Sequence, residues 1–182
     1  MRLHGKAMWA AALAAVFAAG CGQPGRIDGP AAKLPAGESS PAYLDRVAGG
    51  KTVSENDAAR GILLLLDGQD PAETFQQRVE TLRARGIVDA SWDFQADRAL
   101  TRGKLAYMIW RACKLPGGVT LTLAGPSQRY CLRELQYRGF MAEGTMFTPV
   151  SGMEFLAVLT RADHYLQTGQ VPEVLGGTGG AP

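Results

Sequence analysis

The chain has 182 residues, of which 46% are hydrophobic and 20% are charged, with 19 basic and 17 acidic side chains. This length and apolar share suffice for one folded domain and exclude a highly charged disordered chain. Without residues 1–20, which hold two basic residues and no acid, 17 basic and 17 acidic residues remain. A balanced charge gives no general attraction for nucleic acid, so we expect no nucleic-acid partner.

Residues 1–20 have the layout of a secretory signal peptide. A basic end precedes the uncharged, mostly apolar residues 7–19, which are too few for a membrane span of about 20 residues. Residues 18–21 (AAGC) resemble the bacterial lipobox, although Ala18 stands where leucine is usual. The sequence therefore predicts a membrane-anchored lipoprotein acylated at Cys21, the alternative being an ordinary signal peptide with a cysteine at the cleavage site.

Residues 21–41 are expected to form a flexible tether behind the lipidated cysteine. Eight of the residues from Gly22 to Pro41 are glycine or proline, so the segment cannot bury enough apolar area to fold. In bacterial lipoproteins an aspartate directly after the cysteine commonly retains the protein at the inner membrane. Gly22 therefore favours the periplasmic face of the outer membrane, where the organism has one.

An all-α domain is predicted over residues 42–175, followed by a disordered glycine-rich tail over 176–182. Apolar residues recur at helical spacing in five segments, which are bounded by glycine, proline or aspartate. The segments begin at hydroxyl residues suited to cap a helix, namely Ser54, Thr74, Thr101, Ser127 and Ser151.

Three of these helix starts repeat. Residues 100–106 align with 150–156 at an offset of 50, and residues 53–59 join them at an offset of 47. Each copy has an apolar residue followed by a hydroxyl N-cap: Ser54, Thr101 and Ser151. Such a cap stabilises a helix by about 1 kcal/mol, and the apolar residue before it fixes the entry angle.

The elements before the caps repeat as well. Residues 82–88 resemble 135–141, since in both a helix ends on glycine and two apolar residues follow. An aromatic residue expected to be buried comes next, Phe94 in one copy and Phe147 in the other. Because one such unit cannot bury its own apolar face, we expect the units to pack on one another.

These motifs resemble the S-layer homology (SLH) repeat over roughly residues 50–166. Residues 144–149 (GTMFTP) are similar to the loop of that repeat and residues 100–104 (LTRGK) to its helix start. The resemblance implies a small all-helical bundle of repeats that docks a secreted protein on a cell-wall polymer or another envelope glycan.

In SLH repeats the arginine of the helix start often contacts an acidic polymer group. Only Arg102 matches it, because Glu55 and Gly152 hold the equivalent places. The resemblance makes Thr101 and Arg102 the candidate ligand-binding residues. The alternative is a solvated arginine beside a structural cap.

Other chemistry-bearing patterns are incomplete. Residues 50–52 (GKT) lack the upstream glycine and strand of a phosphate-binding loop. His164, the sole histidine after processing, has no nucleophile motif beside it and sits where histidine offsets a helix dipole. Asp67, Asp70 and Glu73 lack the spacing of a calcium loop and favour a turn. We therefore expect no catalytic residue, metal site or cofactor.

Two features leave alternatives open. Cys113 and Cys131 could form a disulfide in an oxidising compartment, or each could be a small buried apolar residue. Residues 118–124 alternate apolar and polar, which fits a short strand or a loop that packs Val119, Leu121 and Leu123 on the bundle.

A cluster of aromatic residues flanks the second unit and could line a sugar-binding groove or belong to the core; it comprises Trp92, Phe94, Tyr107, Trp110, Tyr130 and Tyr137. We expect a non-catalytic envelope protein that links the membrane to a cell-surface polymer or another envelope protein. The alternative is an envelope enzyme or accessory subunit with an unrecognised active site.

Overall fold

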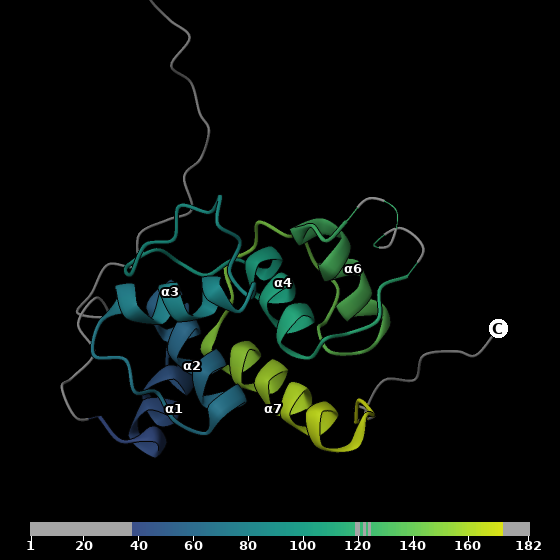
Figure 1. The fold of residues 1–182 in the computed structure, drawn as a ribbon. Coiled ribbons are helices and arrows are strands. Elements are labelled where there is room, and N and C mark those ends of the chain that lie inside the picture. Colours follow the sequence, from purple (N-terminus) through teal and green to yellow (C-terminus); the bar gives the residue numbers. More distant parts are fainter. Residues whose placement is uncertain (1–37, 119–120, 122, 124, 173–182) are drawn as a thin grey trace, which may run out of the picture.

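The computed structural model describes residues 38–118, 121, 123 and 125–172. This part of the chain holds six α-helices and no β-strand, with two isolated β-bridges between extended segments (Figure 1). The predicted all-α class is confirmed. Cys21, the predicted signal peptide and the predicted tail 176–182 lie outside the described residues. No helix in the described ranges has the length and apolar character needed to cross a bilayer.

Helix α1 (Ser40–Ala48) was not among the expected helices. Its N-cap is Ser39, and its buried residues Tyr43 and Val47 lie four apart, on one face. The side chain of Glu38 packs against it through an ion pair to Arg46 at 2.8 Å. The described fold therefore includes Glu38, a few residues before the expected start of the domain at residue 42.

Helices α2 (Glu55–Asp67) and α3 (Phe75–Ala84) follow. Gly68 ends α2 in the left-handed conformation, at φ 69°, which glycine adopts without strain. Thr74 starts α3 with a capping box, in which the Gln77 side chain bonds back to the Thr74 backbone.

The second half of the domain contains α4 (Arg102–Ala112), α6 (Gln128–Tyr137) and α7 (Gly152–Thr168). The five expected helices all form, within a few residues of their expected starts. We refer to α1 and α2 as the first unit, α3 and α4 as the second, and α6 and α7 as the third.

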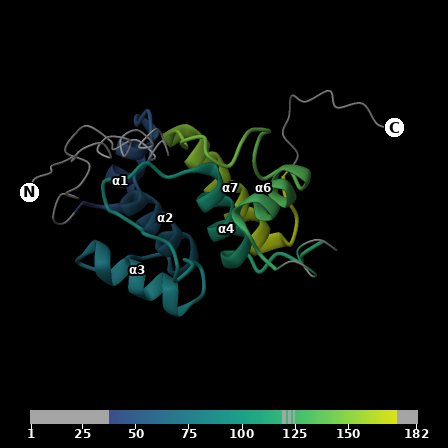
Figure 2. The same cartoon turned by 90° about the horizontal axis from the view of Figure 1, so that it is seen from above.

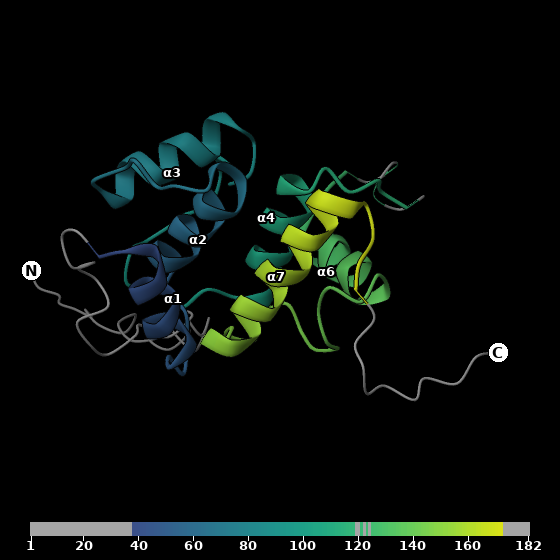
Figure 3. The same cartoon turned by 90° about the horizontal axis from the view of Figure 1, so that it is seen from below.

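The helices pair in a closed cycle. Helix α2 packs on α3, α4 on α6, and α7 on α1, so each capped helix lies against the first helix of the next unit. Helix α2 also contacts both α4 and α7 and so occupies the middle of the bundle. In Figures 2 and 3 helix α1 and helix α6 lie at opposite ends of the domain.

The glycine stops repeat in three dimensions. Gly86 and Gly139 have φ values of 68° and 79°. In both copies the two residues after the glycine donate to one carbonyl of the preceding helix, that of Leu82 in one copy and Leu135 in the other. The first unit has no such stop, since only residues 49–53 join α1 to the cap of α2.

Two expectations about apolar residues are corrected. Phe94 is buried, but Phe147 is 74% exposed, because Met146 turns toward the core in its place. Leu121 and Leu123 are helical rather than extended, and only Leu121 is buried, Leu123 being 82% exposed. Val119 lies outside the described residues.

Candidate functional site

The three repeated helix starts are capped alike. Ser54, Thr101 and Ser151 each have extended backbone and accept a hydrogen bond from the amide three residues later, at 2.9, 3.4 and 3.2 Å. Each side chain satisfies a helix-start amide that would otherwise lack a partner.

The residues before these caps form a ring of backbone hydrogen bonds. Val53 donates to the carbonyl of Val150 at 2.9 Å, Val150 donates to Leu100 at 2.9 Å, and Leu100 donates to Val53 at 2.8 Å. All three residues are buried. The three helix starts therefore meet around one point, which gives the bundle an approximate three-fold arrangement.

Arg102 connects the second unit to the third. Its Nε lies 2.7 Å from Glu154 Oε1, and its Nη1 donates to the carbonyl of Glu143 at 2.7 Å. A Cβ atom at Gly144 would come within 1.7 Å of the same Nη1, so the loop approaches the guanidinium closely. Thr101 is buried as a cap. Both predicted ligand-binding residues thus have contacts within the protein.

An equivalent ion pair joins the first and second units. Lys104 Nζ pairs with Oε1 of Glu55, whose side chain is fully buried. The other oxygen of Glu55 accepts from the amide of Gln95 at 2.6 Å. Lys104 Nζ also lies 5.0 Å from the ring centre of Phe94 and 5.7 Å from that of Trp92. The pair therefore supports the aromatic residues of the loop before α4.

Beside these aromatic residues is a groove of about 440 Å³ between the second and third units. We call it the aromatic groove; its walls are Asp89, Trp92, Tyr107, Pro126, Ser127, Gln128, Arg129, Met146 and Phe147. The rings of Trp92 and Tyr107 meet edge to face, with centroids 5.0 Å apart. A Cβ at Gly103 would lie 2.8 Å from Gln128 Oε1, so the bare glycine lets α4 and α6 close on this side of the groove.

The aromatic groove combines flat apolar walls with hydrogen-bonding groups of both kinds. Asp89 accepts from the hydroxyl and the amide of Ser91 at 2.6 and 2.9 Å, which lowers the pKa of the Asp89 carboxyl. It therefore remains an ionised acceptor. Arg129 supplies donors, and Gln128 supplies both donor and acceptor.

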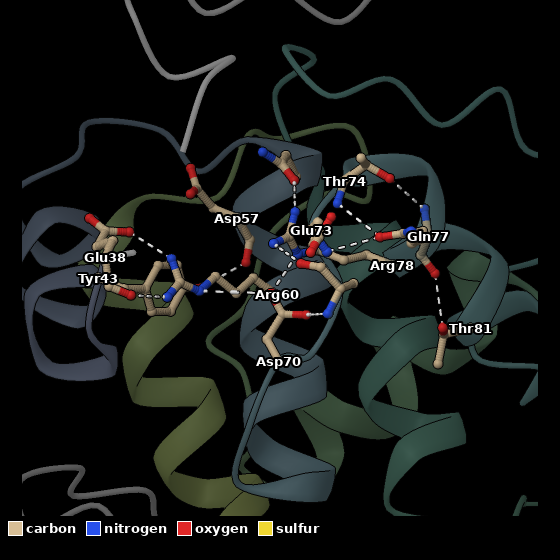
Figure 4. A network of polar contacts seen from close by, with 12 residues as sticks. Glu38, Tyr43, Asp57, Arg60, Asp70, Glu73, Thr74, Gln77, Arg78 and Thr81 are labelled. Atoms are coloured by element: carbon tan, nitrogen blue, oxygen red, sulfur yellow. Dashed lines mark hydrogen bonds and ion pairs between the residues drawn. The ribbon is translucent and has the colours of Figure 1, made fainter. Parts of the chain in front are cut away.

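A second polar cluster lies between the first unit and helix α3 and is mostly buried (Figure 4). We call it the arginine network; it consists of Glu38, Tyr43, Arg46, Asn56, Asp57, Arg60, Asp70 and Arg78. Arg60 Nη1 lies 2.7 Å from Glu38, and its Nε lies 3.9 Å from Asp70. Asp70 in turn accepts from Arg78 Nε at 2.6 Å. Helices α1, α2 and α3 are joined by these contacts.

The charges of the arginine network stabilise one another. Bonds from Arg46 and the nearby charge of Arg60 lower the pKa of Glu38, against the opposing effect of burial. Burial raises the pKa of Tyr43, whose hydroxyl donates to the carbonyl of Asp57 at 2.7 Å. Arg60 also stacks over the Tyr43 ring at 4.6 Å. Glu38 is therefore ionised and Tyr43 neutral near pH 7.

The possible disulfide is not formed. Cys113 and Cys131 are both free thiols in the core, which is the alternative that the sequence left open. Burial raises the pKa of both thiols to about 12. Neither has the ionised sulfur that a nucleophile or metal ligand requires near neutral pH.

The remaining candidates have structural contacts. Asp70 pairs with Arg78, and Asp67 pairs with Arg85 at 2.8 Å. His164 lies near the end of α7, with Nδ1 2.9 Å from the carbonyl of Gln170. Within the described ranges no three or more His, Cys, Asp or Glu residues are grouped so that they could hold a metal ion.

Sequence reasoning identified part of the aromatic groove and missed the arginine network. Of the six aromatic residues singled out, Trp92 and Tyr107 line the groove, whereas Tyr137 is 89% exposed elsewhere. Phe147, which was expected to be buried in the core, is exposed and lines the groove. The arginine network had one signal in the sequence: Asn56 and Asp57, which both belong to it, are adjacent polar residues at the start of a predicted helix.

Comparison with known proteins gave no match to any protein-family model, to any curated protein sequence or to any solved structure.

Proposed function

We propose that this chain is a non-catalytic, lipid-anchored protein of the bacterial cell envelope whose SLH-like domain binds a cell-surface glycan. In this proposal Cys21 carries the acyl chains, and residues between it and Glu38 span the distance to the domain. The protein links a membrane, at the outer membrane's periplasmic face where one exists, to a polymer beyond it.

The aromatic groove is the observation that carries the glycan assignment. Sugars present C–H faces that pack on aromatic rings and hydroxyls that both donate and accept hydrogen bonds. The groove offers Trp92 and Phe147 for the first purpose and Asp89, Gln128 and Arg129 for the second. Its volume of about 440 Å³ is enough for one or two sugar rings.

The position of the groove supports a linking function. The groove adjoins α6, whereas the chain from Cys21 enters the domain at α1, at the opposite end (Figure 2). The proposed glycan site and the start of the described fold at α1 therefore lie at different places on the domain.

The SLH resemblance suggests how Arg102 contributes. Its contact to the carbonyl of Glu143 holds the loop that continues to Met146 and Phe147. We propose that Arg102 positions this wall of the groove, while direct contact with an acidic group of the polymer remains the prediction of the resemblance.

The test is co-sedimentation of the full chain, carrying Cys21→Ser to keep it free of membrane, with purified cell-wall sacculi that retain their attached polymers. Phe147→Ala removes an exposed ring worth about 1 kcal/mol of contact and should weaken retention about five-fold. Tyr137→Ala is the control, because that aromatic residue is also exposed, at 89%, and does not line the groove. No retention of the parent chain, or equal loss in both variants, would disprove the proposal.

A further inference from the structure

Glu38 is the point at which the chain from the proposed membrane anchor meets the folded domain. Its carboxylate accepts from Arg46 Nε and Nη2 at 2.8 and 3.2 Å and from Arg60 Nη1 at 2.7 Å. Its backbone carbonyl accepts from Arg60 Nη2 at 2.6 Å. The side chain is only 6% exposed. Four charge-assisted hydrogen bonds therefore hold one residue at the start of the domain.

Helix α1 by itself is a weak place to attach a tether. It has nine residues, and isolated helices shorter than about 12–15 residues are marginal in water. Only Tyr43 and Val47 are buried along it. Tension applied to Ser39 alone would open this helix from its first turn, one hydrogen bond at a time.

Arg60 connects Glu38 directly to α2, so that tension on Glu38 acts on α2 as well as on α1. It belongs to α2, the helix in the middle of the bundle, and it holds both the carboxylate and the carbonyl of Glu38 (Figure 4). Its Nε lies 3.9 Å from Asp70, which is bonded to Arg78 of α3. A pull on Glu38 therefore acts on three helices together, and several bonds must break at once.

We infer that the arginine network is a clamp that transfers tension from the membrane tether to the central helix α2 and keeps α1 folded under load. The importance of tension rests on the proposed membrane anchoring. The clamp itself, a protection of α1 by Glu38, does not depend on it, so the two can fail separately.

The first experiment measures hydrogen exchange in the full chain, in dodecyl maltoside micelles, for the parent, Glu38→Ala and the control Glu80→Ala. Glu80 is an exposed glutamate on α3. The α1 amides should exchange at least ten-fold faster in Glu38→Ala, with α2 and α4 amides within two-fold of the parent. Unchanged α1 exchange, or equal acceleration in all helices, would overturn the clamp.

The second experiment stretches the full chain between handles at residue 21 and at the end of α7. In Glu38→Ala an early step at low force should release residues 38–48, about 4 nm of chain at roughly 3.5 Å per residue. The parent and Glu80→Ala should lack this step. The same early step in the parent would show that Glu38 carries no load and would overturn the clamp. Membrane anchoring is tested separately: if the parent chain did not co-purify with membranes, the anchoring alone would be refuted.

Discussion

Replacing Lys104 by methionine tests whether the buried pair between the first and second units stabilises the fold. The change keeps the length of the side chain and leaves the carboxylate of Glu55, which is fully buried, without its cation. Removing one partner of a buried pair costs about 3–5 kcal/mol. We expect a loss near the lower end, about 3 kcal/mol at pH 7, because the amide of Gln95 still donates to Glu55.

The size of this loss should depend on pH. Burial raises the pKa of Glu55 and Lys104 lowers it, so the variant has a still higher pKa in the folded state. A carboxyl whose pKa is raised by folding favours the fold fully below its unfolded pKa, and this contribution is lost as the pH rises through the folded pKa. The destabilisation should therefore be clearly smaller at pH 4 than at pH 7.

Urea denaturation at both pH values, followed by circular dichroism, measures these free energies. Adding Glu55→Gln to Lys104→Met removes the buried charge while keeping an acceptor for Gln95, and should recover at least half of the loss at pH 7. A loss below 1 kcal/mol at pH 7, a loss independent of pH, or a double variant as unstable as the single one would refute the reasoning.

Three further predictions use single changes or the unmodified chain. Cys21→Ser should move the protein from the membrane to the soluble fraction, and continued membrane attachment would exclude lipidation at that residue. Cys113 and Cys131 should resist alkylation at pH 8 until the chain is unfolded, and a 2 Da difference between reduced and non-reduced intact mass would show instead that they are bridged. Gly152→Ala would place a Cβ within 1.7 Å of the Val47 carbonyl oxygen, so the free energy of unfolding, measured by thermal denaturation, should fall by about 2–3 kcal/mol. An unchanged melting temperature would contradict the close approach of α1 and α7.

Local signals in the sequence were sufficient for five of the six helices in the described part of the chain, and for the starts of those five. Ser54, Thr101 and Ser151 cap helices because capping depends on a residue and its next few neighbours. Helix α1 was not predicted, because Pro41 and the glycines that precede it are typical of a tether. Its stability comes from distant contacts, such as that of Tyr43 with the carbonyl of Asp57, and these have no local signature.

The prediction that Phe147 is buried was wrong, and Phe147 is a residue of the candidate site. The repeat implied that Phe94 and Phe147 occupy equivalent places, yet one is buried and the other is 74% exposed. Ser151 follows Gly139 by 12 residues, whereas Thr101 follows Gly86 by 15, and in this shorter loop Met146 packs against the core instead of Phe147. Sequence similarity defines which residues correspond, whereas loop length decides which of two neighbours faces the core.

One position in the three repeated helices helps to explain why the aromatic groove is open, whereas the corresponding place beside α2 is filled by the arginine network. Six residues after each cap stand Arg60, Tyr107 and Ala157. Arg60 extends into its own surroundings and pairs with acids from two other segments, so that space is taken up by the arginine network. The ring of Tyr107 meets that of Trp92 edge to face, and the two rings form one wall of the aromatic groove. The same position in the repeat thus contributes to a mostly buried polar network in the first unit and to the wall of an open groove in the second.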